Sequence, residues 1–496
     1  MASVQITCGT STRILLCEPG TNLLEVLRTN GYEIPAHCSG RGHCGKCNVL
    51  INGRSVLSCQ ITVQDGMSIT IPQPMNQLSI LTEGSHLPIQ PDGTDRYVAA
   101  LDIGTTTLVA YLLDGSTGSV LQTASRLNPQ GSYGADVISR IAYAQHGGAA
   151  QLQQVIQDAL CAMLLEVSAQ EGITPLEITA ICAVGNTAMH HLFLGIDTES
   201  LVVPPYMPAV RSLLEMEAVC VLPVLTNARL RILPNIAGFV GADTVGCLAA
   251  SQFDLRNATT LLLDIGTNGE MVLDTGSRRI ACSTAAGPAF EGADICCGMR
   301  GSAGAIDHAF WDADGSIQYH VLGEGPAKGI CGSGLVDIVY ALLKTGRINS
   351  AGRITAADCH RDEAGRKFFL LKDGIRLTQQ DIRQLQLAKA AIRSGIELMA
   401  QELGLAVSCI QRVYLAGAFG NYLDAASACG IGLIPQVLAD RIVPIGNAAG
   451  TGAKICALNR DCFESTAALA QETEFLELSS SRAFQSVYLK NLNFGS

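Results

Sequence analysis

Apolar and polar positions alternate in short runs along the N-terminal part of the chain, which is the pattern of β-strands. Such runs occupy residues 4–7, 13–16, 48–51, 54–58 and 67–71. An Asn-Gly pair at residues 52–53 separates two of them and predicts a tight hairpin turn. A helical pattern covers residues 23–28, with Thr21 or Asn22 as its N-cap. Strands crossed by one helix predict an α+β domain of the β-grasp type over residues 1–73.

The hydrophobic pattern changes after this domain. Residues 74–95 are rich in Pro, Gly and polar residues without lasting periodicity, which predicts a flexible linker. From Arg96 onward, apolar strand patterns alternate with long helical patterns, which indicates α/β architecture. A helix that begins with a Thr378-x-x-Asp381 capping box is expected to run to about residue 402.

One strand–turn–strand pattern occurs twice in the α/β part. Asp102-Ile-Gly-Thr-Thr-Thr follows the apolar run 97–101, and Asp264-Ile-Gly-Thr-Asn-Gly-Glu follows the apolar run 261–263. A second apolar strand comes after each turn. A hairpin used twice predicts two related subdomains that face each other, over residues 96–255 and 256–496.

Composition and charge narrow the class of protein. The formal net charge of −11 argues against a nucleic-acid partner, because binding phosphates requires a surplus of Lys and Arg. The N-terminus lacks the basic and apolar regions of a signal peptide, and no apolar run approaches the ~18 residues that cross a bilayer. We therefore expect a cytoplasmic protein without a membrane span. Most of the 19 cysteines are expected to be free buried thiols, a load that would suit an anaerobe.

Four cysteines have the spacing of a metal-cluster site. Cys38, Cys44 and Cys47 form a C-x5-C-x2-C loop, and Cys59 follows after eleven residues. Glycines inside the loop let its backbone wrap closely and turn N–H groups toward sulfur. A zinc site is the alternative. The glycine-rich loop and the surrounding β-grasp pattern favour a [2Fe–2S] cluster with these four thiolates as ligands, so we expect electron transfer to be part of the function.

The two Asp-Ile-Gly-Thr hairpins suit the binding of a triphosphate, because tight turns after strands expose N–H groups and threonine hydroxyls. The predicted phosphate-binding residues are Gly104, Thr105, Thr106, Gly266, Thr267 and Asn268. Asp102 and Asp264 are expected to face each other across a cleft, hold Mg²⁺ through water and orient the attacking water or acceptor. Glu270 is a further candidate for activating water, or equally a solvated strand residue.

A third element covers residues 413–421, where a strand breaks into a Gly-rich turn and then a helix. The backbone of Gly417, Ala418 and Gly420 would allow a flat adenine and ribose to lie against it, although a plain strand-to-helix turn is the alternative. Lys389 and Arg393 lie one turn apart on the preceding helix. They either flank the nucleotide or belong to a solvated face.

The two hairpins and the Leu-Ala-Gly-Ala-Phe-Gly turn resemble the phosphate-1, phosphate-2 and adenosine motifs of the actin, sugar-kinase and heat-shock-chaperone ATPase superfamily. Further segments narrow the resemblance: Val184-Gly-Asn-Thr-Ala-Met-His-His191, Ala285-Ala-Gly-Pro-Ala-Phe-Glu-Gly292, Cys297-Gly-Met-Arg300, Gly329-Ile-Cys-Gly-Ser-Gly334 and Ile445-Gly-Asn-Ala-Ala-Gly450. With the N-terminal ferredoxin pattern, nearly the whole chain resembles the reductive activators of corrinoid-dependent methyltransferases and O-demethylases. The resemblance implies a β-grasp ferredoxin followed by an actin-like ATPase of two ribonuclease-H-like subdomains.

What this family does is implied by the resemblance alone. Its members use ATP and a low-potential electron to return a corrinoid protein from inactive Co(II) to Co(I). The implied cofactors are one [2Fe–2S] cluster and ATP with Mg²⁺. The implied partners are a corrinoid protein of a methyltransferase system and an electron donor of the ferredoxin or flavodoxin type, or a reductase. A plant-type cluster near about −400 mV does not by itself drive a more negative couple far, so ATP-dependent closure would have to shift the equilibrium.

The sequence departs from the family pattern in two ways, and several readings stay open. It lacks the extra domain that larger family members carry before the first hairpin, which leaves homodimerisation open. It also lacks the extra Cys-rich repeats at the C-terminus, which implies a single cluster. His190 and His191 either approach the corrinoid or belong to the core, and Cys296 and Cys297 form either a redox pair or part of a structural turn. The competing functions are a small-molecule kinase of the sugar- or acetate-kinase class with a redox-sensing ferredoxin domain, and an electron carrier that binds nucleotide without turnover.

Overall fold

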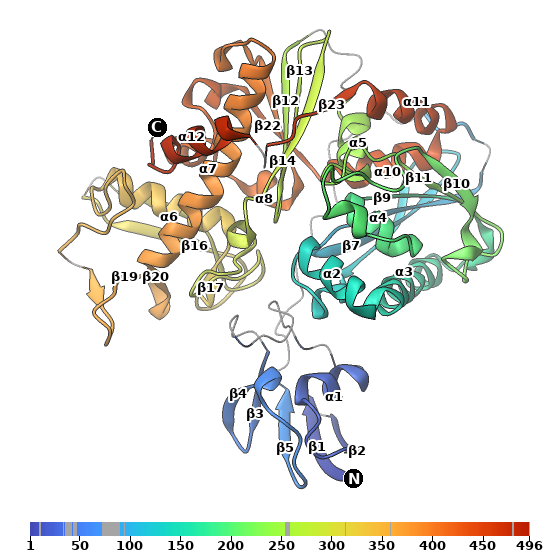
Figure 1. Ribbon diagram of the computed structural model, residues 1–496, viewed down its shortest axis with the longest axis horizontal. Helices are drawn as coiled ribbons and strands as arrows, with labels where there is room; N and C mark the ends of the chain where they lie inside the picture. The colour runs from blue at the N-terminus through green and yellow to red at the C-terminus, as the bar shows by residue number, and fades with distance from the viewer. Residues whose placement is uncertain are drawn as a thin grey trace.

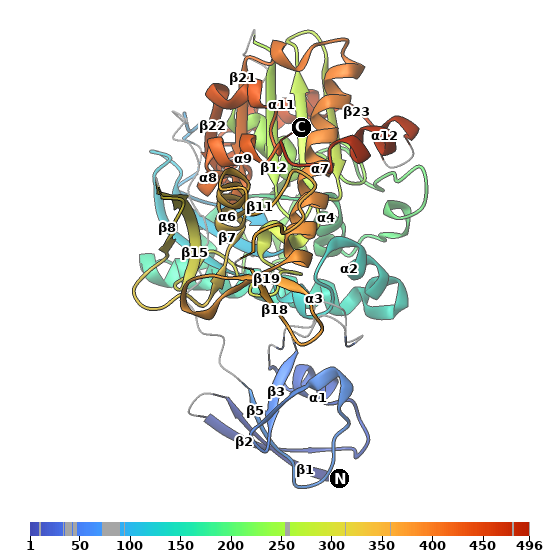
Figure 2. The ribbon, with the colours of Figure 1, turned by 90° about the vertical axis from the view of Figure 1, so that its left-hand side faces the viewer.

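The computed structural model describes residues 1–8, 11–32, 34, 42, 47–71, 90–93, 95–252, 258–312, 314–357, 359–478 and 481–495. A small N-terminal unit lies below two larger parts, each of which is built around a six-stranded sheet (Figure 1). The second view shows the same separation of the small unit from the rest (Figure 2). Most of the predicted linker lies outside the described residues. Its last residues contact the larger parts, since the backbone N–H of Asp92 donates to the Leu458 carbonyl at 3.1 Å.

The N-terminal unit is a five-stranded sheet in the order β2-β1-β5-β3-β4. Its strands are β1 (Ala2–Cys8), β2 (Ser11–Cys17), β3 (Asn48–Ile51), β4 (Arg54–Leu57) and β5 (Ser68–Ile71). Helix α1 (Leu23–Thr29) buries four apolar side chains against this sheet, and Asn22 caps it by accepting from the Leu24 N–H at 3.0 Å. Asn52 and Gly53 have φ of +50° and +78°, as the predicted hairpin requires. The β-grasp prediction is confirmed.

The first larger part contains a sheet in the order β10-β11-β9-β6-β7-β8. Strands β6 (Tyr97–Ile103), β7 (Thr107–Asp114) and β8 (Val120–Leu127) form an antiparallel meander. On its other side, β9 (Ile178–Gly185) and β11 (Arg229–Ile232) add in parallel, and β10 (Leu214–Glu217) forms the edge. One face is covered by α3 (Ala149–Glu171) and α4 (Thr187–Leu194), with α2 (Val137–Tyr143) beside them.

The second larger part repeats this plan in the order β22-β21-β12-β13-β14-β23. Strands β12 (Thr260–Ile265), β13 (Gly269–Asp274) and β14 (Arg279–Thr284) form the meander, and β21 (Arg412–Ala416) and β22 (Ile442–Gly446) add in parallel. Strand β23 (Thr473–Phe475) pairs with β14. Helix α7 (Gln379–Glu402) covers the outer face and has the predicted Thr378–Asp381 capping box. Each copy of the hairpin therefore belongs to its own six-stranded sheet.

The second part also carries two three-stranded sheets and further helices. The strands are β15 (Ala305–Trp311), β16 (Ile317–Val321) and β17 (Gly329–Ile330) in one sheet, and β18 (His360–Arg361), β19 (Lys367–Leu370) and β20 (Arg376–Thr378) in the other. The helices are α6 (Gly332–Lys344), α8 (Gly417–Tyr422), α9 (Ala425–Gly430), α11 (Arg460–Gln471) and α12 (Arg482–Lys490). Within the described ranges, no helix is long and apolar enough to cross a membrane.

The two large sheets share one core, formed between them by α5 (Ala242–Ala250) and α10 (Ala448–Leu458). These helices pack closely against each other at their glycines. A Cβ atom on Gly452 would lie only 2.1 Å from the Gly246 carbonyl oxygen, so a larger residue would not fit there. Helix α10 follows β22 of the second sheet, yet it packs on β6 and β9 of the first. The N-terminal unit contacts the first larger part through Arg28 of α1, whose guanidinium lies 5.6 Å from the centre of the Tyr133 ring.

Candidate active site

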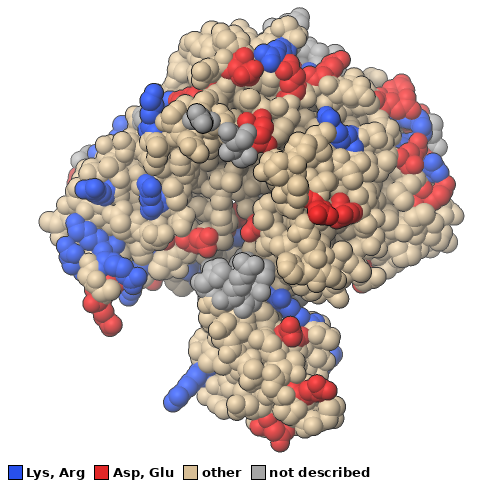
Figure 3. Space-filling model, in the orientation of Figure 1, with Lys and Arg blue, Asp and Glu red and all other residues tan. Residues whose placement is uncertain are grey.

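The two predicted aspartates lie at equivalent ends of β6 and β12, where each strand enters its turn. Burial raises the pKa of Asp102 to about 6, a hydrogen bond from Asn447 opposes the rise, and repulsion from Asp264 adds to it. Burial likewise raises the pKa of Asp264 to about 6. Asp264 is close enough to Asp102 to repel its charge, so the fold brings the two hairpins to one site. The space-filling view shows a hollow between the two larger parts (Figure 3).

Two further carboxylates complete what we call the acidic group, which consists of Asp102, Asp243, Asp264 and Glu270. Burial and then repulsion from Asp264 and Asp102 raise the pKa of Asp243 to about 7. Glu270 lies directly opposite Asp264 in the β12–β13 register, and burial followed by the charges of Asp243 and Asp264 raises its pKa well above the usual value. Glu270 therefore shares the electrostatic environment of Asp243 and Asp264, and its role in activating water stays a prediction. Sequence reasoning missed Asp243, whose only signal is an acidic residue in the first turn of a helix after Gly241.

The chemistry of the acidic group fits a divalent cation that is held indirectly. Several carboxylates disfavour one another's ionisation in a buried site, and a cation relieves that repulsion. Within the described part of the chain, no three His, Cys, Asp or Glu side chains form a ready-made metal cage. Magnesium usually keeps several waters and is shared with substrate phosphates. The carboxylates present therefore fit a magnesium ion that would be held through water, and Asp102 and Asp264 stay the residues predicted to hold it.

The turn of the first hairpin is held from outside by polar side chains. Asn128 Nδ2 donates to the Gly104 carbonyl at 2.8 Å, and Arg140 Nη2 donates to the Thr105 carbonyl at 2.5 Å. Asn186, the N-cap of α4, donates from Nδ2 to Thr105 Oγ1 at 2.7 Å. In the second hairpin, the Gly266 N–H donates to the Asn268 carbonyl at 2.8 Å. These contacts fix the turns in which we predict the phosphates bind.

Glu291 connects the two turns and was not singled out from the sequence, although it lies in one of the motifs that carry the family resemblance. Thr106 Oγ1 donates to its Oε2 at 2.8 Å, and Thr267 Oγ1 donates to its Oε1 at 2.5 Å. The two threonines belong to different halves of the protein. One carboxylate therefore accepts two of the three threonine hydroxyls that were predicted to bind phosphate.

The predicted adenosine turn adjoins the second hairpin. Ala416 pairs with Asp264 in the parallel β12–β21 register, and Gly417 follows at φ +81°. A Cβ atom on Gly417 would lie 2.7 Å from Asp264 Oδ1, so only glycine fits there. Gly420 lies in the short helix α8, where a Cβ atom would lie 3.1 Å from the Leu415 side chain. The turn therefore adjoins a residue of the acidic group, and its role in binding adenosine stays a prediction.

Lys389 lies in a different environment from the one its spacing with Arg393 suggested. Its side chain is fully buried, and Nζ donates to the Asn493 carbonyl at 2.5 Å. Burial lowers its pKa to about 7, the charge of Arg393 adds to this, and Glu397 opposes it. The interpretation of Lys389 as part of a solvated face is therefore wrong. Its contact with nucleotide stays a prediction, while Arg393 pairs with Glu397 at 2.6 Å.

Of the four predicted cluster ligands, Cys38 and Cys44 lie outside the described residues. Cys47 and Cys59 are both buried, and the Ser58 N–H and hydroxyl each donate to the Cys47 carbonyl at 2.9 Å. Gln60 Nε2 lies 3.7 Å from Cys59 Sγ as a donor, the kind of contact that tunes a cluster thiolate. Gly42 has φ +83°, and a Cβ there would lie 2.6 Å from the Gln60 side chain. These features fit a closely wrapped cluster.

The paired histidines and cysteines have their own partners. His191 Nδ1 lies 2.7 Å from the Thr187 carbonyl, and its Nε2 accepts from the Ala209 N–H at 3.1 Å. His190 Nδ1 contacts Asn235 Nδ2 at 2.5 Å, and burial lowers the pKa of His190 to about 4, with the charge of His191 adding to this. Both histidines belong to the core. Cys296 is exposed, whereas Cys297 Sγ accepts from the Arg376 N–H at 3.4 Å.

Three family models match consecutive parts of the chain. Residues 6–68 match the 2Fe-2S iron-sulfur cluster binding domain, residues 97–256 match the RACo middle region, and residues 258–496 match the C-terminal domain of RACo, the ASKHA domain. The chain is 31% identical to the corrinoid activation enzyme RamQ of Eubacterium limosum, over 95% of this chain and 96% of that protein. The chain belongs to the family of reductive activators of corrinoid proteins. The family resemblance seen in the sequence is confirmed.

Two other relatives support the family assignment. The [Co(II) methylated amine-specific corrinoid protein] reductase of Methanosarcina barkeri is 27% identical over 80% of this chain and 77% of that protein. A solved structure described as a reductive activator for a corrinoid, iron-sulfur protein superposes with a TM-score of 0.75 at 27% identity, over 99% of this chain and 98% of that chain. The predicted fold, a [2Fe–2S] ferredoxin followed by an actin-like ATPase, is confirmed. The individual ligands of cluster and nucleotide stay predictions.

Proposed function

We propose that this chain uses ATP to drive one electron, taken up in its N-terminal [2Fe–2S] domain, onto a corrinoid protein in the Co(II) state and so restores Co(I). The observation that carries the proposal is the meeting of the acidic group with the Gly417 turn in a chain that also has a ferredoxin unit. The names of the relatives support the same reaction.

Different residues of the ATPase part bind the phosphates, the nucleoside and the magnesium ion of MgATP. The turns at residues 104–106 and 266–268 bind the phosphates, and the Gly417 turn accommodates the nucleoside. Asp102 and Asp264 hold magnesium through water, and Glu270 or Asp264 orients the attacking water. A carboxylate whose pKa lies near neutrality is suited to accept a proton at working pH, and burial brings the pKa of Asp264 to about 6.

The ferredoxin part supplies the electron. When bound, the [2Fe–2S] cluster provides one-electron chemistry at low potential. Burial of Cys47 and Cys59 excludes water from two of the predicted ligands, and the Gln60 amide adds a dipole at Cys59. An ATP-driven change that binds one state of the corrinoid protein better than the other moves the equilibrium toward Co(I), because only differential binding shifts populations.

The finer assignments are part of the same proposal. The partner is a corrinoid protein of a methyltransferase or O-demethylase system. The electron comes from a low-potential donor such as a ferredoxin, a flavodoxin or a reductase. We place the protein in the cytoplasm of an anaerobe and leave both a monomer and a homodimer open.

The test is anaerobic reduction of a purified Co(II) corrinoid protein by the reconstituted full chain with titanium(III) citrate. We expect the Co(I) absorption band to form only when MgATP is present, and basal ATP hydrolysis to rise when the corrinoid protein is added. Asp264→Asn should abolish the ATP-dependent band. Phosphorylation of an added sugar or carboxylic acid in step with ATP consumption would replace this proposal with the kinase function.

A further inference from the structure

Glu291 lies where an anion would have to bind if the two hairpins hold phosphates. Its two carboxylate oxygens each accept one hydroxyl, from Thr106 in the first half and Thr267 in the second. A Cβ atom on Gly266 would lie 3.9 Å from Glu291 Oε1, so the carboxylate is also close to the backbone of the second turn. A carboxylate and a phosphoryl group present similar acceptor oxygens to such donors.

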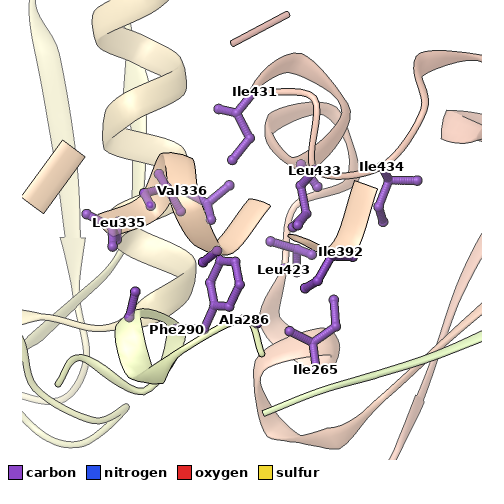
Figure 4. Close-up of a cluster of buried hydrophobic side chains, with 14 of the residues drawn as sticks. Ile265, Ala286, Phe290, Leu335, Val336, Ile392, Leu423, Ile431, Leu433 and Ile434 are labelled. Atoms are coloured by element: carbon purple, nitrogen blue, oxygen red, sulfur yellow. The ribbon is translucent and has the colours of Figure 1, made fainter. Parts of the chain in front are cut away.

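The backbone that carries Glu291 is firmly supported. Glu291 ends the short helix η8 (Pro288–Glu291), and the preceding Phe290 is buried in the core of the second part (Figure 4). The Phe290 and Phe419 ring centres are 4.4 Å apart, and a Cβ on Gly332 would lie 2.0 Å from the Phe290 carbonyl oxygen. The backbone that carries the carboxylate is thus held by packing of the neighbouring residue.

Two arginines lie near enough to the same carboxylate to feel its charge. Burial lowers the pKa of Arg140 to about 9 and also lowers the pKa of Arg300, and in both cases the charge of Glu291 opposes the shift. Arg140 is engaged with the carbonyls of Thr105 and Gly134. Within the described residues, the Arg300 guanidinium donates no hydrogen bond to the protein. Guanidinium groups offer paired N–H donors that match phosphate oxygens. The Arg300 guanidinium is therefore available to bind a phosphate group.

We propose that the Glu291 carboxylate occupies the place of the terminal phosphate in the nucleotide-free protein, and that ATP binds by displacing it. The Thr106 and Thr267 hydroxyls then bind the γ-phosphate, and Arg300 pairs with its charge. This inference rests on the proposed phosphate-binding role of the two turns. Glu291 is a positioning residue that acts through the two threonines.

Displacement of Glu291 would distinguish ATP from ADP. A nucleotide without a terminal phosphate leaves Glu291 in place and keeps the Thr106–Glu291 link between the two halves. ATP breaks that link and replaces it with contacts to the phosphate. A ligand that breaks an inter-half contact only in its triphosphate form has the differential interaction that a population shift requires.

The experiment measures calorimetric binding of the magnesium complexes of AMPPNP and ADP to the full chain, its Glu291→Gln and Glu291→Ala variants, and Glu324→Gln as an exposed control. We expect both Glu291 variants to prefer AMPPNP over ADP about tenfold more strongly than the parent chain does, because a competing charged acceptor is removed. The control keeps the parent preference. Arg300→Lys should lower the AMPPNP preference and leave ADP binding unchanged.

An unchanged preference, or weaker binding of both nucleotides, in the Glu291 variants would overturn this inference. Thermal unfolding of each variant checks that a change in binding is not a loss of fold. The outcome is separable from the proposed function. If the Glu291 variants show no altered preference while the parent chain still forms Co(I) with ATP, only this inference fails. If the parent chain binds neither nucleotide, the proposed function fails.

Discussion

The side-chain amide of Asn447 donates to Oδ2 of Asp102 at 2.8 Å, although 345 residues separate the two. The same amide contacts the Tyr111 hydroxyl at 3.3 Å, and Asn447 Oδ1 caps α10 by accepting from the Gly450 N–H at 2.8 Å. The aspartate of the first hairpin is therefore oriented by a residue that follows the last parallel strand of the second sheet. One side chain joins the start of α10 to the acidic group.

Asn447→Ala should weaken binding of MgAMPPNP by roughly tenfold, because Asp102 loses a donor to its ionised form. The hydrogen bond lowers the pKa of Asp102, so its loss raises that pKa and moves the pH at which binding is half-maximal upward. Calorimetry between pH 5.5 and 8 measures both effects. Asn459→Ala is the matched control, since Asn459 caps α11 in the same way without contact to Asp102. Equal effects of the two variants would show that only helix capping is involved.

The acidic group makes stability depend on pH in a definite direction. The pKa values of Asp102, Asp243 and Asp264 are raised to about 6, about 7 and about 6. Each carboxyl binds more protons in the folded than in the unfolded state between about pH 4 and 7, so their contribution to the free energy of unfolding falls as pH rises through this window. Magnesium should restore part of it at pH 7.5.

Asp102→Asn removes one of these charges and is therefore expected to stabilise the nucleotide-free protein at pH 7.5. The gain is up to about 3 kcal/mol, from roughly two pKa units at about 1.4 kcal/mol each. At pH 4 the difference from the parent chain should shrink, because the carboxyl is then largely protonated. Thermal unfolding midpoints at the two pH values measure the effect. A variant that is destabilised equally at both would contradict the electrostatic explanation.

Gly417→Ala should lower ATP turnover by about ten- to hundredfold, because even a small displacement of a catalytic group lowers the rate by that factor. The new methyl group would lie 2.7 Å from Asp264 Oδ1 and displace the carboxylate. Gly404→Ala provides the matched control, since Gly404 has φ +66° but nothing within 4 Å of its Cβ position. Both variants bear the cost of a left-handed residue, and steady-state ATPase assays compare them. Similar losses in both would assign the effect to backbone strain alone.

Cys59→Ala should bleach the visible absorption and the electron paramagnetic resonance signal of the reduced cluster, because a [2Fe–2S] cluster needs four thiolates. Nucleotide affinity should stay within about twofold of the parent value, since Cys59 lies in the core of the N-terminal unit, apart from the acidic group. Cys220→Ala, at an exposed free thiol, is the control and should keep the cluster. An intact cluster in the Cys59 variant would contradict the ligand assignment.

Local features of the fold were predictable because neighbouring residues encode them. The Asn52-Gly53 turn, the Asn22 cap and the Thr378 capping box depend on contacts within a few residues. The repeated Asp-Ile-Gly-Thr hairpins also predicted two related subdomains. The helical spacing gave a wrong expectation for Lys389, because two cations one turn apart suggest a solvent-exposed helix face. The C-terminal segment instead buries it and accepts its hydrogen bond.

The sequence by itself determined the ferredoxin unit, the two hairpins, the Gly417 turn and their order along the chain. Only the tertiary structure decided that Asp243 joins the acidic group, that Asn447 orients Asp102, and that Glu291 links Thr106 to Thr267. These contacts depend on α5 and α10 crossing between the two sheets at Gly246 and Gly452. Strand and helix periodicity says which face of an element is buried. It does not say which distant element covers that face, because packing between elements is decided by shape and burial over the whole core.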